Sequence, residues 1–151
     1  MSGLMLAELL NETTVAPDVS AESKSAIMTT LLDMLCATGK VLDRDLALRD
    51  LEANERRMSV GMEHGIAIPH AKTDAVKEMV AAIVITRHPL DIGSMDGQPA
   101  QIFLMTLSPK SVSGPHIRFL AEIGRLLRHK SKRQDILAAR TRADLLRALL
   151  D

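Results

Sequence analysis

The residue best placed to do chemistry is His70, which ends the short apolar run Gly-Ile-Ala-Ile-Pro at positions 65–69. This run is too short for a helix, Pro69 fixes φ and cannot donate to a strand ladder, and Gly65 permits a tight entry. We therefore expect His70 at a strand edge or in a turn, partly exposed and held by the backbone. A neutral imidazole in such a place can serve as a nucleophile, a proton shuttle or a metal ligand. A buried histidine with a structural role is the alternative.

The remaining histidines narrow these possibilities; they are His64, His88, His116 and His129. A zinc site built from His64 and His70 would need further ligands, and the chain has neither an H-x-x-x-H pair nor a cysteine cluster to supply them. A Ser-His-Asp hydrolase is disfavoured because no G-x-S-x-G elbow is present. We therefore expect no metal and no cofactor.

Length and charge limit the classes of partner. The 151 residues, 46% of them hydrophobic and 25% charged, suit one compact domain over residues 1–151. Lys plus Arg equals Asp plus Glu at 19 each, so no net field draws the chain to nucleic acid or a membrane surface. Phe103 and Phe119 alone offer no stacking platform for single-stranded nucleic acid or sugar rings. We expect no nucleic-acid partner and no direct carbohydrate binding.

The sulfur-containing residues and the apolar stretches indicate the compartment. Cys36 is the only cysteine, which excludes an internal disulfide and fits a reducing environment. No apolar stretch reaches the roughly 18 residues of a membrane span, and the start lacks the pattern of a secretory signal. We therefore expect a cytoplasmic protein without membrane insertion. The nine methionines are expected to fill the core, with a Met-rich binding groove as the alternative.

Two helices are predicted in the first third of the chain, after an extended lead-in over residues 15–18. Ser20 can cap the first helix, and Gly39 ends it. Its apolar residues recur at helical spacing and are Ile27, Leu31, Met34 and Leu35. Asp43 is an N-cap for a second, highly charged helix that runs to about Asn54.

Two strands and two further helices are predicted in the rest of the chain. Residues 80–86 and 100–107 are nearly continuous apolar runs rich in β-branched residues, which predict neighbouring central strands covered on both faces. A helix begins near His116, with an apolar stripe that consists of Ile117, Leu120, Ile123, Gly124 and Leu127. A last helix begins at Thr141, where Asp144 completes a capping-box pattern.

A basic run lies near the end of the helix that begins at His116; it consists of Arg125, Arg128, His129, Lys130, Lys132 and Arg133. Cations at a helix C-terminus complement the helix dipole and the carbonyl groups that lack partners. The alternative is a docking surface for an acidic protein partner.

Three blocks of the chain resemble a known family. The string Met-Ser-Val-Gly at 58–61, followed by residues 65–70, resembles the active-site segment of the fructose/mannitol-type enzyme IIA domains of the bacterial phosphotransferase system. This family includes a nitrogen-related regulatory branch. Residues 96–99 leading into 102–104, and His116 with the apolar helix after it, agree with the family in order and spacing. The resemblance extends over essentially the whole chain.

The resemblance implies an α/β fold, with one mixed β-sheet sandwiched by α-helices. It places His70 at the position that carries the phosphoryl group, and His116 at the family's second active-site histidine, which assists by hydrogen bonding. The alternative for His116 is a helix-start residue satisfied by solvent. We also expect a backbone carbonyl to hold one ring nitrogen of His70 while the other faces outward.

The chain departs from the family at two positions. Where the family carries an arginine, this chain has Asn54, and a threonine position is occupied by Val60. A cation and a hydroxyl are therefore missing. The candidates for stabilising a phosphoryl group are Arg56, Arg57, Lys72, Asn54 and Ser59.

The resemblance predicts a phosphoryl carrier rather than a stand-alone enzyme. We expect it to accept the group from phosphorylated histidine phosphocarrier protein onto His70 for regulatory signalling, because no transporter or enzyme IIB segment is attached to it. One alternative is a sugar-specific enzyme IIA that passes the group to an enzyme IIB of a fructose/mannitol-type transporter. Another is a regulatory binding module that cannot be phosphorylated.

Overall fold

The structure is a computed structural model that describes residues 4–57, 63–94, 96–112 and 114–151. Its helices are α1 (Leu4–Leu9), α2 (Lys24–Ala37), α3 (Arg44–Arg57), α4 (Gly114–Leu127), α5 (Lys130–Ala138) and α6 (Arg142–Leu150). Its strands are β1 (Val15–Val19), β2 (Ile66–Ala67), β3 (His70–Lys72), β4 (Val80–Leu90) and β5 (Ala100–Ser108). Among the described residues, no helix combines the length and the apolar character that crossing a membrane requires.

The strands form one mixed sheet in the order β1-β4-β5-β2, with β3 also paired to β5. The central pair, β4 and β5, is antiparallel, whereas β1 runs parallel to β4, and β2 and β3 run parallel to β5. The two strands predicted from their apolar runs are therefore confirmed as central neighbours. The extended lead-in predicted over residues 15–18 is confirmed as the edge strand β1.

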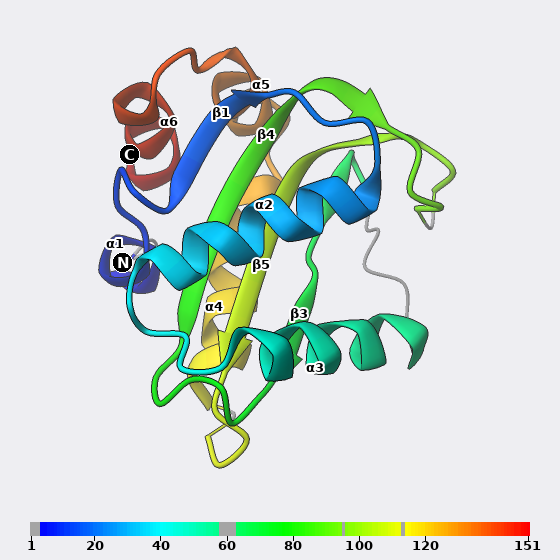
Figure 1. Cartoon of the computed structure of the whole chain (residues 1–151). Coiled ribbons are helices and arrows are strands. Elements are labelled where there is room, and N and C mark those ends of the chain that lie inside the picture. Colours follow the sequence, from blue (N-terminus) through cyan, green and yellow to red (C-terminus); the bar gives the residue numbers. More distant parts are fainter. Residues whose placement is uncertain (1–3, 58–62, 95, 113) are drawn as a thin grey trace.

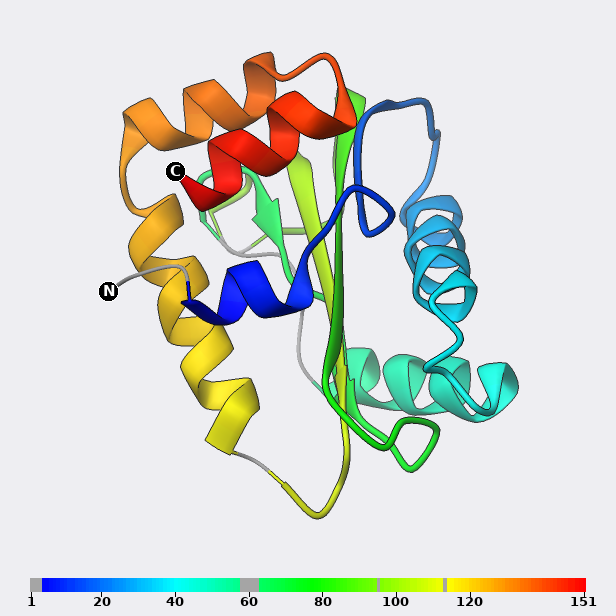
Figure 2. The ribbon, with the colours of Figure 1, turned by 90° about the vertical axis from the view of Figure 1, so that its left-hand side faces the viewer.

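Helices cover both faces of this sheet (Figures 1 and 2). In Figure 2 the sheet is seen nearly edge-on, with α2 and α3 on one side and α1, α4, α5 and α6 on the other. Each side has its own apolar core: Phe103 points into the layer beneath α2 and α3, and Phe119 packs in the layer on the opposite face. The predicted α/β sandwich is confirmed.

The start of α2 corrects one prediction. Ser23, and not Ser20, is the N-cap, because its hydroxyl accepts a hydrogen bond from the backbone N–H of Ala26 over 3.1 Å. A capping hydroxyl lies two or three residues before the N–H that it satisfies. Ser20 is too early for that, since residues 20–23 precede the first helical turn.

Three other predicted helix boundaries are confirmed. Gly39 follows α2 with a φ of +80°, the left-handed conformation that glycine adopts easily. A carboxylate oxygen of Asp43 accepts from the N–H of Leu46 at the start of α3. The hydroxyl of Thr141 accepts from the N–H of Asp144 at the start of α6.

The predicted stripe of α4 is partly wrong. Ile117 is 64% exposed and Gly124 is exposed, while the buried apolar face includes Phe119. The buried residues of α4 are His116, Phe119, Glu122, Ile123 and Leu127. Their spacing of three and four residues places them on one side of the helix, turned away from Ile117.

Candidate functional site

His70 is the first residue of β3, at the sheet edge, as predicted. It pairs in register with Thr106 of β5, whose backbone N–H donates to the carbonyl of Pro69 over 3.1 Å. Its ring nitrogen Nδ1 lies 2.7 Å from the backbone carbonyl oxygen of Ile68. A carbonyl can only accept, so Nδ1 carries the proton and Nε2 keeps its lone pair. The predicted backbone contact to one ring nitrogen of His70 is confirmed. It leaves Nε2 as the nitrogen that can act as a nucleophile.

Gly65 explains why the run before His70 begins with glycine. Its φ is +76°, and a Cβ at this position would lie 3.4 Å from the carbonyl oxygen of Pro99. The Gly65 carbonyl accepts from the N–H groups of Gln101 and Ile102 over 2.9 and 3.1 Å. These bonds fix the start of the run to β5, so the backbone that leads to His70 has a defined path.

Asp96 ties a second block of the sequence to the same segment. One carboxylate oxygen accepts from the N–H of His64 over 3.1 Å, and the other from the N–H of Gln98 over 3.0 Å. These hydrogen bonds, that to Gln98 first, lower the pKa of Asp96 below its usual value. Two blocks that are about 30 residues apart in the sequence therefore meet at the start of the run that leads to His70.

His116 lies in the first turn of α4, and its ring faces that of His70. The two ring centroids are 5.2 Å apart and the planes are tilted by 35°. His116 is only 9% exposed, and its Nδ1 is buried without a hydrogen-bond partner among the described residues. Burial lowers the pKa of His116, and the electrostatic repulsion that a protonated His116 would meet from a protonated His70 and from Lys72 lowers it further. The neutral form of the ring is therefore favoured, with Nε2 as the nitrogen that can face the cavity.

A cavity of about 650 Å³ joins the two histidines. Its walls come from α3, β3, the turn after β5 and the start of α4, and consist of Asp50, Ala53, Asn54, His70, Ala71, Lys72, Lys110 and His116. Two lysines and one carboxylate thus surround the imidazole pair. The sequence reasoning missed Lys110 and Asp50. The sequence carries no local signal for Lys110, because only the parallel pairing of β3 with β5 brings the turn after Ser108 beside Lys72.

The other predicted phosphoryl-stabilising residues fall into three groups. Asn54 lines the cavity, and its side-chain amide donates to the backbone carbonyl of His70 over 2.8 Å. Lys72 lines the cavity directly. Arg56 and Arg57 belong to the last turn of α3, but their side chains lie outside the described part of the structure. Ser59 also lies outside the described residues.

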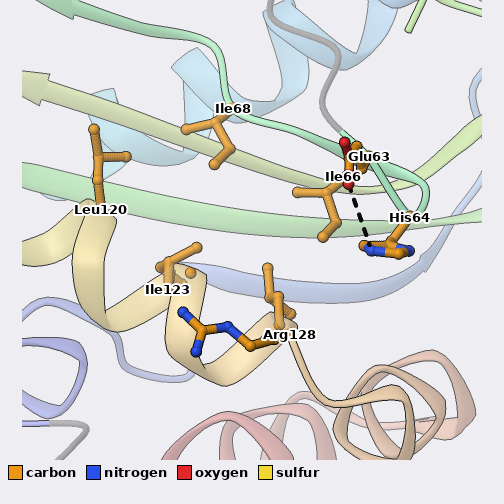
Figure 3. Close-up of a pocket in the computed structure, with 9 residues that line it drawn as sticks. Glu63, His64, Ile66, Ile68, Leu120, Ile123 and Arg128 are labelled. Atoms are coloured by element: carbon orange, nitrogen blue, oxygen red, sulfur yellow. Dashed lines mark ion pairs between the residues drawn. The ribbon is translucent and has the colours of Figure 1, made fainter. Parts of the chain in front are cut away.

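A second pocket, of about 440 Å³, lies between the segment 63–68 and α4 (Figure 3). Ile66 and Ile68 line it from the strand side, and Leu120 and Ile123 line it from the helix. Its rim carries His64, whose ring is 3.8 Å from the carboxylate of Glu63. This pocket holds a single imidazole, whereas the cavity beside His70 holds two. Within the described ranges, no cluster of three His, Cys, Asp or Glu side chains could hold a metal ion.

Comparison with known sequences identifies relatives of the chain. Residues 8–151 match the family profile described as "Phosphoenolpyruvate-dependent sugar phosphotransferase system, EIIA 2". The chain is 35% identical over 120 residues to the PTS system fructose-specific EIIA component of Haloferax volcanii. The aligned residues cover 80% of this chain and 78% of that protein. It is 24% identical over 134 residues to a nitrogen regulatory protein of Pseudomonas aeruginosa, covering 89% and 87% of the two chains.

Solved structures share the fold. The crystal structure of nitrogen regulatory protein IIA-Ntr from Neisseria meningitidis superimposes with a TM-score of 0.83 at 23% identity, covering 96% of this chain and 99% of that one. Enzyme IIA-Mtl of Escherichia coli was solved in complex with phosphorylated enzyme IIB-Mtl. It superimposes with a TM-score of 0.79 at 13% identity, covering 93% of this chain and 96% of that one. The resemblance inferred from the three sequence blocks is confirmed. The chain belongs to the EIIA type 2 family of the phosphoenolpyruvate-dependent sugar phosphotransferase system.

Proposed function

We propose that this EIIA-type phosphoryl carrier accepts its phosphoryl group from phosphorylated histidine phosphocarrier protein onto Nε2 of His70, for nitrogen-type regulation. The proposal rests on one observation above all: Nδ1 of His70 is held by the Ile68 carbonyl while a second imidazole lies 5.2 Å away across the cavity. As part of this proposal, residues 1–151 act as one domain in the cytoplasm.

The transfer step follows from the tautomer of His70. The Nε2 lone pair attacks the phosphorus of the donor's phosphohistidine, the new N–P bond forms, and the donor's N–P bond breaks. The electron pair of the broken bond returns to the donor's ring nitrogen. The proton on Nδ1 stays where the Ile68 carbonyl accepts it. Little covalent work remains for other residues, so positioning and charge stabilisation carry the catalysis.

His116 and Lys72 are the proposed supporting residues. A neutral His116 with its proton on Nε2 can donate a hydrogen bond to a phosphoryl oxygen on His70. The Lys72 ammonium lies in the wall of the same cavity and can attract the same oxygens. The transferred group adds about −1.5 to −2 charges at the surface, so partner proteins can distinguish the two forms.

A sugar-specific role is the second candidate, and the 35% identity to a fructose-specific EIIA component favours it. A relative of the same fold was solved in complex with a phosphorylated enzyme IIB. In this case the chain would pass its phosphoryl group to an enzyme IIB of a fructose/mannitol-type transporter. The two lysines in the cavity count against a module that cannot be phosphorylated.

Labelling with phosphoenolpyruvate, enzyme I and histidine phosphocarrier protein tests the proposal. The chain should acquire acid-labile, base-stable phosphate, and His70→Ala should abolish it. His88→Ala, which changes an exposed histidine outside the cavity, is the matched control and should label normally. Label that persists in His70→Ala would refute the site. Adding a fructose- or mannitol-type enzyme IIB separates the candidates, because only a sugar-specific carrier should lose its label to it.

A further inference from the structure

We propose that Lys110 is a phosphoryl-binding residue of the His70 cavity and that Asp50 opposes it, so that these two charges set how strongly His70 holds the group. This inference rests on the proposed carrier function. Neither residue belongs to the sequence blocks that identify the family. Both reach the cavity only through the pairing of β3 with β5 and the packing of α3 against β3.

Lys110 is placed by a turn directly after β5. The N–H of Val112 donates to the carbonyl of Pro109 over 3.2 Å, which closes the turn around Lys110. The preceding strand residue, Ser108, pairs with Lys72, so the turn begins beside the end of β3. Lys110 forms no ion pair with any described residue, and its side chain lines the cavity that holds His70. Its ammonium is therefore available to an anion there.

A second cation is needed because the nearest polar groups are neutral. Asn54, at the position of the family arginine, carries no charge, and its amide donates to the His70 carbonyl. Burial, and after it the electrostatic interactions with His70 and Lys72, lower the pKa of His116, which disfavours a positive charge on its ring. Lys72 alone would only balance Asp50, leaving a phosphoryl group of nearly two negative charges without compensation. Lys110 supplies the positive charge that the substitution at position 54 removes.

Asp50 supplies the opposing charge. It projects from α3 into the same cavity, and its Oδ2 is buried without a hydrogen-bond partner among the described residues. A carboxylate beside a phosphoryl group repels it, and the repulsion is stronger where water is excluded. Asp50 therefore weakens the hold of His70 on the group and favours its onward transfer. Removing the charge of Asp50 should therefore strengthen the hold of His70 on the phosphoryl group, whereas removing the charge of Lys110 should weaken it.

The experiment measures the equilibrium constant for phosphoryl exchange between phosphorylated histidine phosphocarrier protein and the full chain, by separating phosphorylated and free forms. Lys110→Met should lower the constant about fivefold and Lys110→Arg should restore it, as expected for one partly exposed charge pair. Asp50→Asn should raise it about fivefold. Both shifts should shrink in 1 M KCl because salt screens them. Lys130→Met and Asp135→Asn, on exposed positions of α5, are the charge-matched controls and should leave it unchanged.

The outcomes separate this inference from the carrier function. A wild-type chain that takes no label at His70 refutes the carrier function itself. A wild-type chain that labels normally, with Lys110→Met indistinguishable from Lys130→Met, overturns the assignment of Lys110 and leaves the carrier function standing. If Asp50→Asn fails to melt cooperatively, the contrast among Lys110→Met, Lys110→Arg and Lys130→Met still decides the role of Lys110.

Discussion

The side-chain amide of Asn54 donates a hydrogen bond to the backbone carbonyl of His70 over 2.8 Å, which connects α3 directly to the peptide that carries the reacting imidazole. At this position the family carries a cation. In this chain the residue holds the backbone of His70 instead, while the charges come from elsewhere in the cavity. Asn54 therefore contributes to the site by holding the backbone of His70 in position.

Asn54→Ala should weaken both the fold and the transfer. The change removes a donor from the His70 carbonyl, which should lower the free energy of unfolding by about 1 kcal/mol. It should also slow labelling of His70, because the ring is less firmly positioned. Urea unfolding and single-turnover labelling measure the two effects. Asn54→Asp keeps the size of the side chain, but a carboxylate cannot donate a hydrogen bond. This variant should therefore be labelled no faster than Asn54→Ala. Labelling by both variants at the wild-type rate would contradict the positioning role.

His116 should make stability depend on pH. Its pKa is lowered in the folded state, by burial first, from a usual value of 6.5. Below about pH 6.5 the unfolded chain therefore binds a proton that the folded chain resists, and stability rises with pH in this range. The contribution of a neutral His116 to the free energy of unfolding is complete above about pH 6.5. It is lost as the pH falls through the pKa that His116 has in the folded state.

The measurement compares urea unfolding at pH 7.5 and pH 5.5. Wild type should lose more stability between these values than His116→Gln, which cannot take up the proton. His129→Gln is the control, since this histidine is exposed and lies outside the cavity. An equal loss in wild type and His116→Gln would show that His116 does not carry the pH dependence.

Much of the fold could be predicted because certain patterns strongly favour one structure. A run such as residues 80–86 is short, apolar on both faces and rich in β-branched residues, which favours a central strand. Asp43 and Thr141 precede helical periodicity at cap spacing, and both caps are confirmed. The position of His70 followed equally from local rules, because the chemistry of proline and the length of the run exclude a helix.

The rest depended on contacts between distant segments. The helix α5 was not predicted, since Lys130–Ala138 is mostly polar and buries a single apolar residue, Ile136. The basic run was seen as one feature, but it spans two helices, and Arg133 at its end donates to the carbonyls of Leu127 and Arg128. Lys110 and Asp50 carried no local signal at all, since only strand pairing and helix packing bring them to His70.

Gly65→Ala should destabilise the chain. An alanine at a φ of +76° costs about 1–2 kcal/mol, while its Cβ would only touch the carbonyl oxygen of Pro99 at 3.4 Å. Gly124→Ala is the matched control, because this glycine is helical and an added Cβ meets nothing within 4 Å. The control should gain about 0.5–1 kcal/mol from better helix propensity. The thermal midpoint should therefore fall in Gly65→Ala and rise in Gly124→Ala. A Gly65→Ala chain as stable as wild type would show that this backbone conformation is not required.

Glu122 should hold the first helix in place without serving the transfer. It is buried on α4, and its carboxylate accepts from the N–H groups of Met5 and Leu6 over 3.2 and 3.1 Å. These donors lie in the first turn of α1, where the helix itself offers them no partner. Glu122→Ala leaves both unsatisfied, so the free energy of unfolding should fall by about 1–3 kcal/mol. Glu122→Gln keeps one acceptor and should lose less.

Amide hydrogen exchange separates a local effect from a global one at Glu122. In Glu122→Ala the amides of Met5 and Leu6 should exchange faster, while those of the central strands β4 and β5 follow only the change in global stability. Phosphoryl labelling of His70 should proceed at the wild-type rate, since His116 lies in the first turn of α4 and packs against His70 independently of α1. Slowed labelling in a folded Glu122→Ala chain would instead show that α1 and the histidine pair are coupled through α4.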